Sequence, residues 1–444
     1  MKNQKSRLPC LLTDGFLALL PVFLLWPGTE GYQAIQEAKF RLFCLLFGGY
    51  LLLLFLLGAE LALVRGQRPP HPAELWKKSS PAQKLVALYW LFSAISTLLS
   101  PLRQEALFGM TRNEGLLTIT LYCSCFLCVS AFSRPAPWMA YLFGAAMTAF
   151  CLISILQLSG ENPFHLYPAG TNYSGANTAY SGVFLGTTGN ADLTAALLCL
   201  SIPVFWIFPL RSSGRLRFLL LLPLALCIFV LRKLNVQAGI LGAGLGSLLA
   251  LPAVLPAKKR SKRAVWLALA LLLSAMLAVV WFFDLPQISL HELHELLHGR
   301  GRDEFGNGRI LIWRQVLALV PAHLWFGTGP DTMSAAHLTG YGMYSAKLGG
   351  IIRYRIDTAH NEYLNILFHQ GIFALLAYLG ALAASAFSWL RRNGRSASAA
   401  AAGGAVLCYA LQAFFGFSMC QTAGFFWVAW AVLERSLQWQ EEKS

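Results

Sequence analysis

The stretch Asp357–Ala374, DTAHNEYLNILFHQGIFA, joins a polar cluster to the start of an apolar helix. Its polar residues are Asp357, His360, Asn361 and Glu362, and a mostly apolar run follows them directly. The stretch therefore predicts that His360 lies where a water-facing loop meets a membrane-spanning helix. At such a boundary a titratable side chain can meet a substrate in water while the helix holds it in place.

The composition of the whole chain favours a membrane-embedded fold. Of the 444 residues, 56% are hydrophobic and only 12% are charged, whereas soluble domains carry about 25% charged residues. Apolar runs of about 20 residues, the length that crosses a bilayer, recur along the sequence. We therefore expect an all-α, polytopic integral membrane protein with a single membrane domain over residues 1–444, and not a soluble-type core.

About 12 segments have the length and flanking charges of transmembrane helices. Their approximate ranges are 10–27, 41–64, 82–100, 115–133, 136–158, 191–210, 216–232, 234–256, 264–285, 363–390, 398–418 and 421–437. The first residues, Met1–Arg7, precede a long apolar run. That arrangement is typical of a cytoplasmic start rather than of a cleavable signal peptide.

The net charge of +15 indicates membrane topology rather than nucleic-acid binding. The basic residues occur in short clusters between apolar runs. With the N-terminus inside, most of the 35 lysines and arginines fall in inside segments. The positive-inside rule then predicts cytoplasmic N- and C-termini and a large outer-face loop over residues 286–362.

The predicted outer loop contains its own helix. Within Arg309–Gly329, RILIWRQVLALVPAHLWFGTG, the apolar residues recur at helical spacing, which predicts an amphipathic helix lying on the membrane. Pro321 and the glycines at positions 327 and 329 mark its end. The loop is therefore structured, and we expect it to carry the site, because it ends at His360.

The outer loops combine several arginines with this histidine. The arginines are Arg300, Arg302, Arg309, Arg314, Arg353 and Arg355 in the large loop and Arg103, Arg112 and Arg232 in other loops. A guanidinium group binds phosphate through two parallel hydrogen bonds, and an imidazole can take a proton from a hydroxyl group. Together they predict a lipid-linked diphosphate as donor and a hydroxyl as nucleophile. Binding of lipid headgroups alone is the competing interpretation.

A second motif lies in His291–His298, HELHELLH, which contains the H-E-x-x-H pattern of zinc metalloproteases. At helical spacing His294 and His298 share one face, and Glu295 would act as the base. The overlapping His/Glu repeat weakens this interpretation, because it is typical of an amphipathic helix with a solvated face, and the spacing defines no third ligand. We predict no metal at the site and keep a membrane zinc metalloprotease as an alternative.

A transporter is a third class, and it would place ionisable residues deep within the spans. The charges of this chain gather instead in outer loops, which favours chemistry at the membrane surface. Asp192 follows the turn GTTGN, Gly186–Asn190, at the start of a span. It is either a site residue or the partner in an interhelical hydrogen bond.

The motif around His360 resembles a known family, the O-antigen ligase and O-antigen polymerase superfamily of bacterial polytopic membrane proteins. Its hallmark is a histidine at the end of the large outer loop, followed by Asn, nine residues and Gly. Here His360 and Asn361 are followed by the nine residues Glu362–Gln370 and then by Gly371.

Three further segments resemble the same family. GRILIWRQVLALVPAHLWFGTGP matches its R-x-x-x-W and G-x-G positions with Arg309, Trp313, Gly327 and Gly329. GTTGNADLTAALLCLSIP resembles its G-T-x-G-N segment before a span, and FGMTRNEGLLT, with Arg112 and Glu114, resembles a short outer-loop motif. The resemblance covers most of the chain in the same order.

The resemblance implies a metal-independent glycosyltransferase that needs no cofactor. It would move a glycan from a polyprenyl (undecaprenyl) diphosphate carrier to a hydroxyl of a glycan, lipid or protein acceptor. The reaction would take place at the outer face of the cytoplasmic (inner) membrane of a bacterium. A polymerase of lipid-linked repeat units is the nearest alternative, because it shares the chemistry and differs in the acceptor.

The resemblance also suggests roles for individual residues. Arg309, with Arg314 or an arginine of a neighbouring loop such as Arg112, would bind the diphosphate and stabilise it as leaving group. His360 would position or deprotonate the acceptor hydroxyl. The remaining candidates are Asn361 in the substrate-binding set and Asp357 or Glu362 as the carboxylate that orients His360.

One position departs from the family pattern. Members commonly carry an arginine at the start of a glycine-rich span, and here LNVQAGILGAG places Gln237 there. Either Arg232 with Lys233 supplies the positive charge from a few residues earlier, or this chain binds the diphosphate differently.

Overall fold

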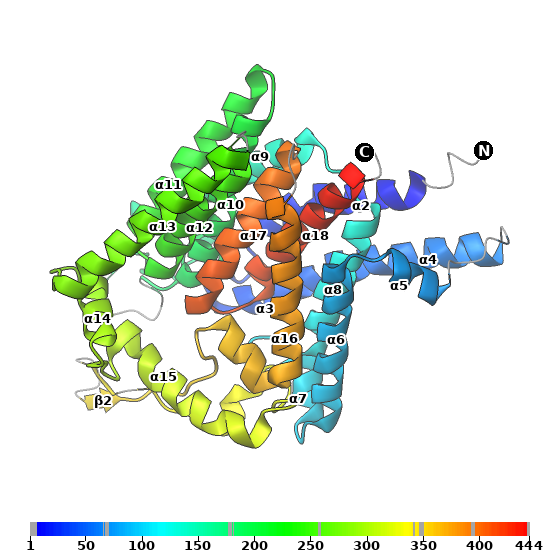
Figure 1. The fold of residues 1–444 in the computed structure, drawn as a ribbon. Helices are drawn as coiled ribbons and strands as arrows, with labels where there is room; N and C mark the ends of the chain where they lie inside the picture. The colour runs from blue at the N-terminus through cyan, green and yellow to red at the C-terminus, as the bar shows by residue number, and fades with distance from the viewer. Residues whose placement is uncertain are drawn as a thin grey trace.

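The structure is a computed structural model of the chain. It describes residues 7–64, 66, 71–175, 180, 182–255, 259–340, 342–345, 350–391 and 396–441. The architecture is a bundle of helices with one short hairpin at one end (Figure 1). The predicted all-α class is thereby confirmed.

Nine helices in the described part of the chain are long and apolar enough to cross a membrane. Eight of them are α2 (Arg7–Leu25), α6 (Pro81–Leu99), α9 (Pro137–Leu158), α10 (Ala191–Arg211), α12 (Gln237–Val254), α13 (Lys259–Phe282), α16 (Glu362–Arg391) and α17 (Ala397–Gln412). The ninth runs over Ile35–Leu63 and consists of α3 (Ile35–Phe43), a π-helical turn (Cys44–Gly48) and α4 (Gly49–Leu63). The polytopic membrane class follows from these helices.

The three other predicted spans are helical as well. They are α8 (Leu116–Phe132), which is apolar but shorter, α11 (Leu221–Leu234) and α18 (Cys420–Glu441). The remaining elements are short. They are the helices α5 (Pro72–Lys78), α7 (Arg103–Phe108), α14 (Ile288–Leu297) and α15 (Phe305–Leu319) and the antiparallel strands β1 (Met343–Ser345) and β2 (Gly350–Ile352).

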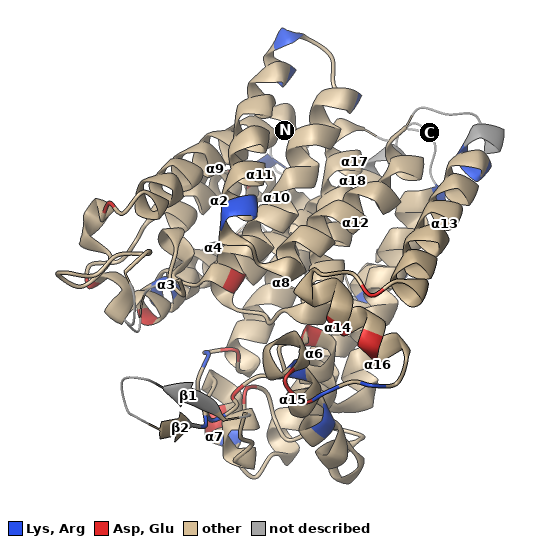
Figure 2. Cartoon of the chain, turned by 90° about the vertical axis from the view of Figure 1, so that its left-hand side faces the viewer, with Lys and Arg blue, Asp and Glu red and all other residues tan. Residues whose placement is uncertain are grey.

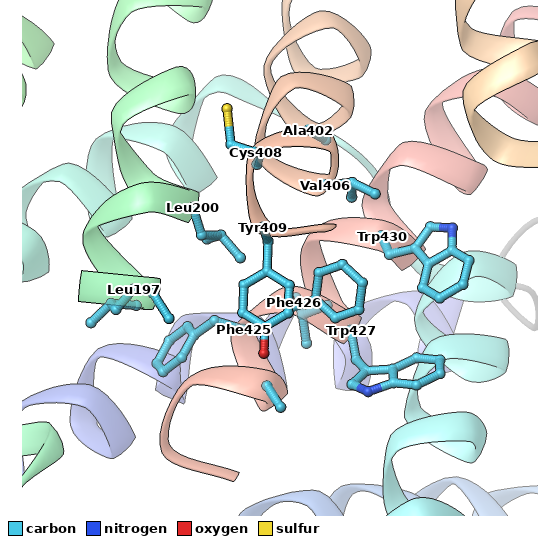
Figure 3. Close-up of a cluster of buried hydrophobic side chains, with 14 of the residues drawn as sticks. Leu197, Leu200, Ala402, Val406, Cys408, Tyr409, Phe425, Phe426, Trp427 and Trp430 are labelled. Atoms are coloured by element: carbon cyan, nitrogen blue, oxygen red, sulfur yellow. The ribbon is translucent and has the colours of Figure 1, made fainter. Parts of the chain in front are cut away.

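Helix α17 owes its central position to small side chains. Its sequence ASAAAAGGAVLCYALQ lets neighbouring helices approach closely. A Cβ atom at Gly403 would lie 2.2 Å from the Trp389 ring, and one at Gly404 would lie 2.3 Å from Ile207. On its other side Tyr409 stacks on Phe426 with ring centroids 4.3 Å apart (Figure 3). These contacts join α10, α16 and α18 around α17.

The elements of the predicted outer loop gather at one end of the bundle. Helices α7, α14 and α15 and the β-hairpin lie there, while the start of α2 and the end of α18 lie at the opposite end (Figure 1). Charged residues are sparse along the bundle and more frequent around α14, α15 and α7 (Figure 2). This end carries the candidate site.

The amphipathic helix predicted from Arg309 onward is present as α15. Part of its apolar face packs on the chain itself, because Ile312 and Val316 are buried, whereas Leu317 is exposed. Ile312 and Val316 pack in a cluster with Met333, Ala359 and Phe368. The helix thus supports the segment that carries His360.

Helix α16 is interrupted at Gly371, which has φ +83° and ψ −179°. The interruption is where the backbone of residues 324–329 crosses the helix: Gly329 N–H donates to His369 O at 2.8 Å, and Ile372 N–H donates to Leu324 O at 2.8 Å. A Cβ atom at Gly371 would lie 2.3 Å from Trp325 O. Only glycine accommodates both this conformation and this close approach.

Candidate active site

His360 is held by a hydrogen-bonded turn that precedes α16. The Trp313 indole N–H donates to Ala359 O at 2.8 Å, and Ala359 N–H donates to Asn365 Oδ1 at 2.8 Å. Asn361 caps the helix, since its Oδ1 accepts from Leu364 N–H at 3.0 Å. His360 itself has a positive φ of 48°, a conformation that is uncommon for residues with a side chain and that the surrounding bonds must enforce.

The His360 imidazole is largely enclosed. Its ring meets the Phe417 ring edge to face, with centroids 5.3 Å apart, and its Nδ1 is buried without a hydrogen-bond partner among the described residues. Burial lowers the pKa of His360 to about 3, and the nearby positive charges of Arg309 and Arg112 act in the same direction. The imidazole is therefore uncharged at neutral pH.

Arg112 reaches this site from the connection between α7 and α8. The buried Asp331 fixes that connection by accepting from Thr111 N–H at 3.1 Å, from Arg112 N–H at 2.8 Å and from the Thr111 hydroxyl at 3.2 Å. Asp331, which follows the Gly327–Gly329 turn, therefore bonds to both the backbone and the side chain of the α7–α8 connection. Asp331 positions Arg112.

The Arg112 guanidinium forms a bidentate ion pair with Asp357. Nε donates to Oδ2 at 3.0 Å and Nη2 donates to Oδ1 at 2.9 Å. The guanidinium carbon also lies 4.2 Å from the centroid of the Phe417 ring, within the range of a cation–π contact. Phe417 therefore touches both Arg112 and His360.

Arg309 approaches from the first turn of α15. Gly306, Asn307 and Gly308 all have positive φ, so the regular helix begins at Arg309, and glycine and asparagine are the residues that tolerate this conformation. Arg309 Nη1 donates to Gly306 O at 3.1 Å, while Nε is buried without a partner among the described residues. Burial lowers the pKa of Arg309.

Asp192 joins the same group of charges. It lies at the start of α10, where the Asn190 side chain accepts from the N–H groups of Asp192 at 2.7 Å and Leu193 at 3.3 Å. Asp192 interacts electrostatically with Arg309 and Arg112. Four separate segments thus meet at this end: the α7–α8 connection, the start of α10, the start of α15 and the turn before α16.

The carboxylates expected to orient His360 have other partners. Asp357 pairs with Arg112, as described above, and the buried Glu362 accepts a hydrogen bond from the Tyr378 hydroxyl at 2.7 Å. In this structure His360 is therefore oriented by its backbone and by Phe417.

The other predicted substrate-binding residues lie further from these contacts. Arg314 is exposed and pairs with Asp303 at 2.8 Å. Arg232 is exposed in the last turn of α11. Gln237 begins α12, and its side-chain amide donates to Asn235 Oδ1 at 3.1 Å. Of the arginines considered as a second phosphate ligand, Arg112 is the one that interacts with His360.

Three residues of the site escaped the sequence analysis. Asp331 stands directly after the Gly327–Pro330 segment, and a carboxylate adjoining a glycine-rich turn is a signal that could have been used. Asn365 lies within the His360 motif itself. Phe417 stands in an apolar stretch between two helices, where nothing in the sequence separates it from a core residue.

A small cavity of about 70 Å³ lies beside the Arg112–Asp357 ion pair. Its lining includes Glu114, Glu362 and Gln370. Glu114 accepts a hydrogen bond from the Tyr122 hydroxyl at 2.9 Å, and burial raises the pKa of its carboxyl group. The cavity has room for a few water molecules.

The histidines in and directly after α14 are engaged in local contacts. His294 Nδ1 lies 2.7 Å from Val280 O, and His298 Nδ1 lies 2.8 Å from His294 O. Glu295 forms an ion pair with Arg300 at 2.7 Å. The described residues contain no group of three or more His, Cys, Asp or Glu side chains that could hold a metal ion.

Fold and site together define a polytopic membrane protein with an arginine-rich, histidine-containing site at one end of its bundle. Residues 222–379 match the sequence model of a family described as O-antigen ligase. The match runs from α11 to Leu379 within α16 and includes Arg309 and His360, so the resemblance predicted from the motifs is confirmed over this segment. No curated protein matches the chain.

Proposed function

We propose that the protein is a glycosyltransferase of the O-antigen ligase type. It transfers a glycan from a polyprenyl diphosphate carrier to an acceptor hydroxyl at the outer face of the cytoplasmic membrane of a bacterium. Both termini lie in the cytoplasm, residues 1–444 act as one membrane domain, and residues 286–362 face outward. The observation that carries the proposal is that His360, within the segment that matches the O-antigen ligase family, contacts the same Phe417 ring as Arg112.

The chemistry follows from the charges of the site. The acceptor oxygen attacks the anomeric carbon of the donor sugar, its proton passes to the imidazole of His360, and the bond between the sugar and the diphosphate breaks. The electron pair of that bond goes to the diphosphate, which gains negative charge as it leaves. Arg309 and Arg112 stabilise this charge, because guanidinium groups in a partly buried site need little rearrangement to do so.

An apolar groove supports a donor with a long hydrocarbon chain. Its volume is about 930 Å³, and its lining comes mainly from α12, α16 and α17. At one end it is bounded by Tyr363, Phe414 and Phe415, and both phenylalanine rings contact Trp313, the residue that binds Ala359 beside His360. A polyprenyl chain in this groove would bring its diphosphate toward His360.

The proposal is tested by replacing His360 in protein reconstituted with a polyprenyl diphosphate-linked glycan and an acceptor. His360→Gln preserves shape and polarity but cannot take up a proton, and we expect glycan transfer to fall about 100-fold or more. His323→Gln is the matched control, since His323 ends the short 3-10 helix Val320–His323 that follows α15. This variant should leave transfer unchanged. Full transfer by a folded His360→Gln protein would overturn the assignment.

A polymerase of lipid-linked repeat units would use the same residues. The two activities differ in the acceptor, which is a second lipid-linked glycan for a polymerase. Incubation with the lipid-linked repeat unit as the only substrate separates them: growth of longer glycans indicates a polymerase, and a requirement for a different acceptor indicates a ligase.

The metalloprotease alternative would place chemistry at His294, Glu295 and His298. The Glu295–Arg300 ion pair disfavours it, because the carboxylate that would act as base is held by a guanidinium group. Metal analysis of the purified protein tests it directly. Zinc bound in equal amount to the protein and lost in His294→Ala would favour the protease.

A further inference from the structure

Asp357 occupies the part of Arg112 that an anionic substrate would use. Both Nε and Nη2 of the guanidinium donate to the Asp357 carboxylate, and these two donors form the fork that binds phosphate through two parallel bonds. The Asp357 side chain is 35% exposed, against 19% for Arg112. An anion arriving from solvent can therefore compete with the carboxylate for the guanidinium.

His360 offers Asp357 a second place to bind. Its Nδ1 is buried and makes no hydrogen bond with the described residues, and the imidazole already interacts electrostatically with Asp357. A buried ring nitrogen without a partner carries a free-energy cost. A carboxylate that accepted a hydrogen bond from Nδ1–H would remove this cost and leave Nε2 free to act as base.

We propose that Asp357 exchanges partners when the donor binds: the diphosphate takes Arg112, and the released carboxylate accepts the Nδ1–H of His360. The exchange rests on the proposed function and adds a role for Asp357. Before the donor binds, its carboxylate occupies Arg112 and competes with the diphosphate; after the donor has bound, it positions His360 as the base. The histidine becomes an effective base only when the leaving group is in place.

The surrounding structure restricts the exchange to the Asp357 side chain. Thr358 and Ala359 are buried, and the Asn365 side chain bonds to both: its Nδ2 donates to Thr358 Oγ1 at 2.9 Å and its Oδ1 accepts from Ala359 N–H at 2.8 Å. The backbone that leads to His360 is therefore fixed. Rotation of the carboxylate moves it between its two partners without rearranging the turn.

The test is Asp357→Asn, which keeps the size of the side chain and removes its charge. Binding of farnesyl diphosphate, a short polyprenyl diphosphate, is measured by calorimetry on the full-length protein in detergent. We expect Asp357→Asn to bind it about fivefold more tightly than the wild type, because a competing ion pair is lost. Glycan transfer should nevertheless become slower, and we expect kcat to decrease by a factor of about ten.

A matched control comes from the exposed ion pair of the same loop. Asp303→Asn removes the partner of Arg314 and should change neither farnesyl diphosphate binding nor kcat. A second readout is the pH dependence of kcat. A carboxylate partner raises the pKa of an imidazole, so the acidic limb of the kcat profile should move to lower pH in Asp357→Asn.

The possible outcomes separate the two proposals. Binding by Asp357→Asn that is weaker than, or equal to, that of the wild type would overturn the exchange and leave the transferase assignment intact. Absence of farnesyl diphosphate binding to both proteins, together with absence of glycan transfer, would overturn the proposed function itself.

Discussion

At the scale of single residues, the site depends on how the protein controls the charge of one histidine. Burial lowers the pKa of His360, and the nearby charges of Arg309 and Arg112 add to this effect. The imidazole therefore stays uncharged and adds no third positive charge beside the two arginines. A site built in this way can attract an anion and still hold a neutral base next to it.

The low pKa of His360 predicts that acid destabilises the protein through this residue. The pKa of His360 is about 3 in the folded protein, against 6.5 for an ordinary histidine. Between these two pH values the unfolded chain binds a proton at this residue and the folded protein does not. Stability contributed by the neutral imidazole is therefore complete above pH 6.5 and decreases as the pH falls below it. The loss at pH 5 is at most about 2 kcal/mol.

Thermal unfolding of the wild type and His360→Gln in detergent at pH 7.5 and pH 5 measures this contribution. The wild type should lose more stability on acidification than the variant, which has no group to titrate at this position. Equal losses in both proteins would show that the folded site takes up the proton at its ordinary pKa.

At the scale of elements, the most informative contact is the crossing of α16 by residues 324–329. The H-N-x9-G motif has a physical basis here, since the spacing from His360 to Gly371 places a glycine where the Trp325 carbonyl meets the helix. The same crossing explains Gly327, where a Cβ atom would lie 2.3 Å from the His369 backbone. Two segments of the family pattern thus form one structural unit that supports the histidine.

Gly371→Ala should therefore destabilise the protein strongly. The added Cβ atom would face both a positive φ and a carbonyl oxygen at 2.3 Å, and the backbone strain alone costs about 1–3 kcal/mol. Gly380→Ala is the control within the same helix, because its Cβ atom would meet the Leu85 side chain at 3.4 Å. Thermal unfolding should show a large decrease for Gly371→Ala and little change for Gly380→Ala; similar midpoints would contradict the role of the crossing.

At the scale of the whole molecule, the sequence predicted more of the bundle than of the site. All the apolar segments became helices, because bilayer length and hydrophobicity leave few alternatives. Contacts between distant segments were harder to predict. The pairing of Arg112 with Asp357 and the contact of Phe417 with His360 depend on tertiary packing, and neither residue pair is close in sequence. The packing of Ile312 and Val316 of α15 on the chain itself was not predicted for the same reason.

The apolar groove between α12, α16 and α17 leads to a prediction about the length of the donor's hydrocarbon chain. Ala386 lines the groove, so Ala386→Trp should fill part of it. Binding of a long-chain polyprenyl diphosphate should weaken about tenfold, because burial of each apolar group in the groove contributes to affinity. Binding of inorganic diphosphate, which has no chain, should stay the same.

Phe387→Trp serves as the control, because Phe387 follows Ala386 directly in α16 and is 59% exposed. It changes the bulk of the same helix at an outward-facing position and should affect neither ligand. Equal weakening of both ligands by Ala386→Trp would indicate a general disturbance of the bundle. Unchanged binding of the long-chain ligand would place the polyprenyl chain elsewhere, and the route from the membrane to His360 would then have to lie on another face of α16.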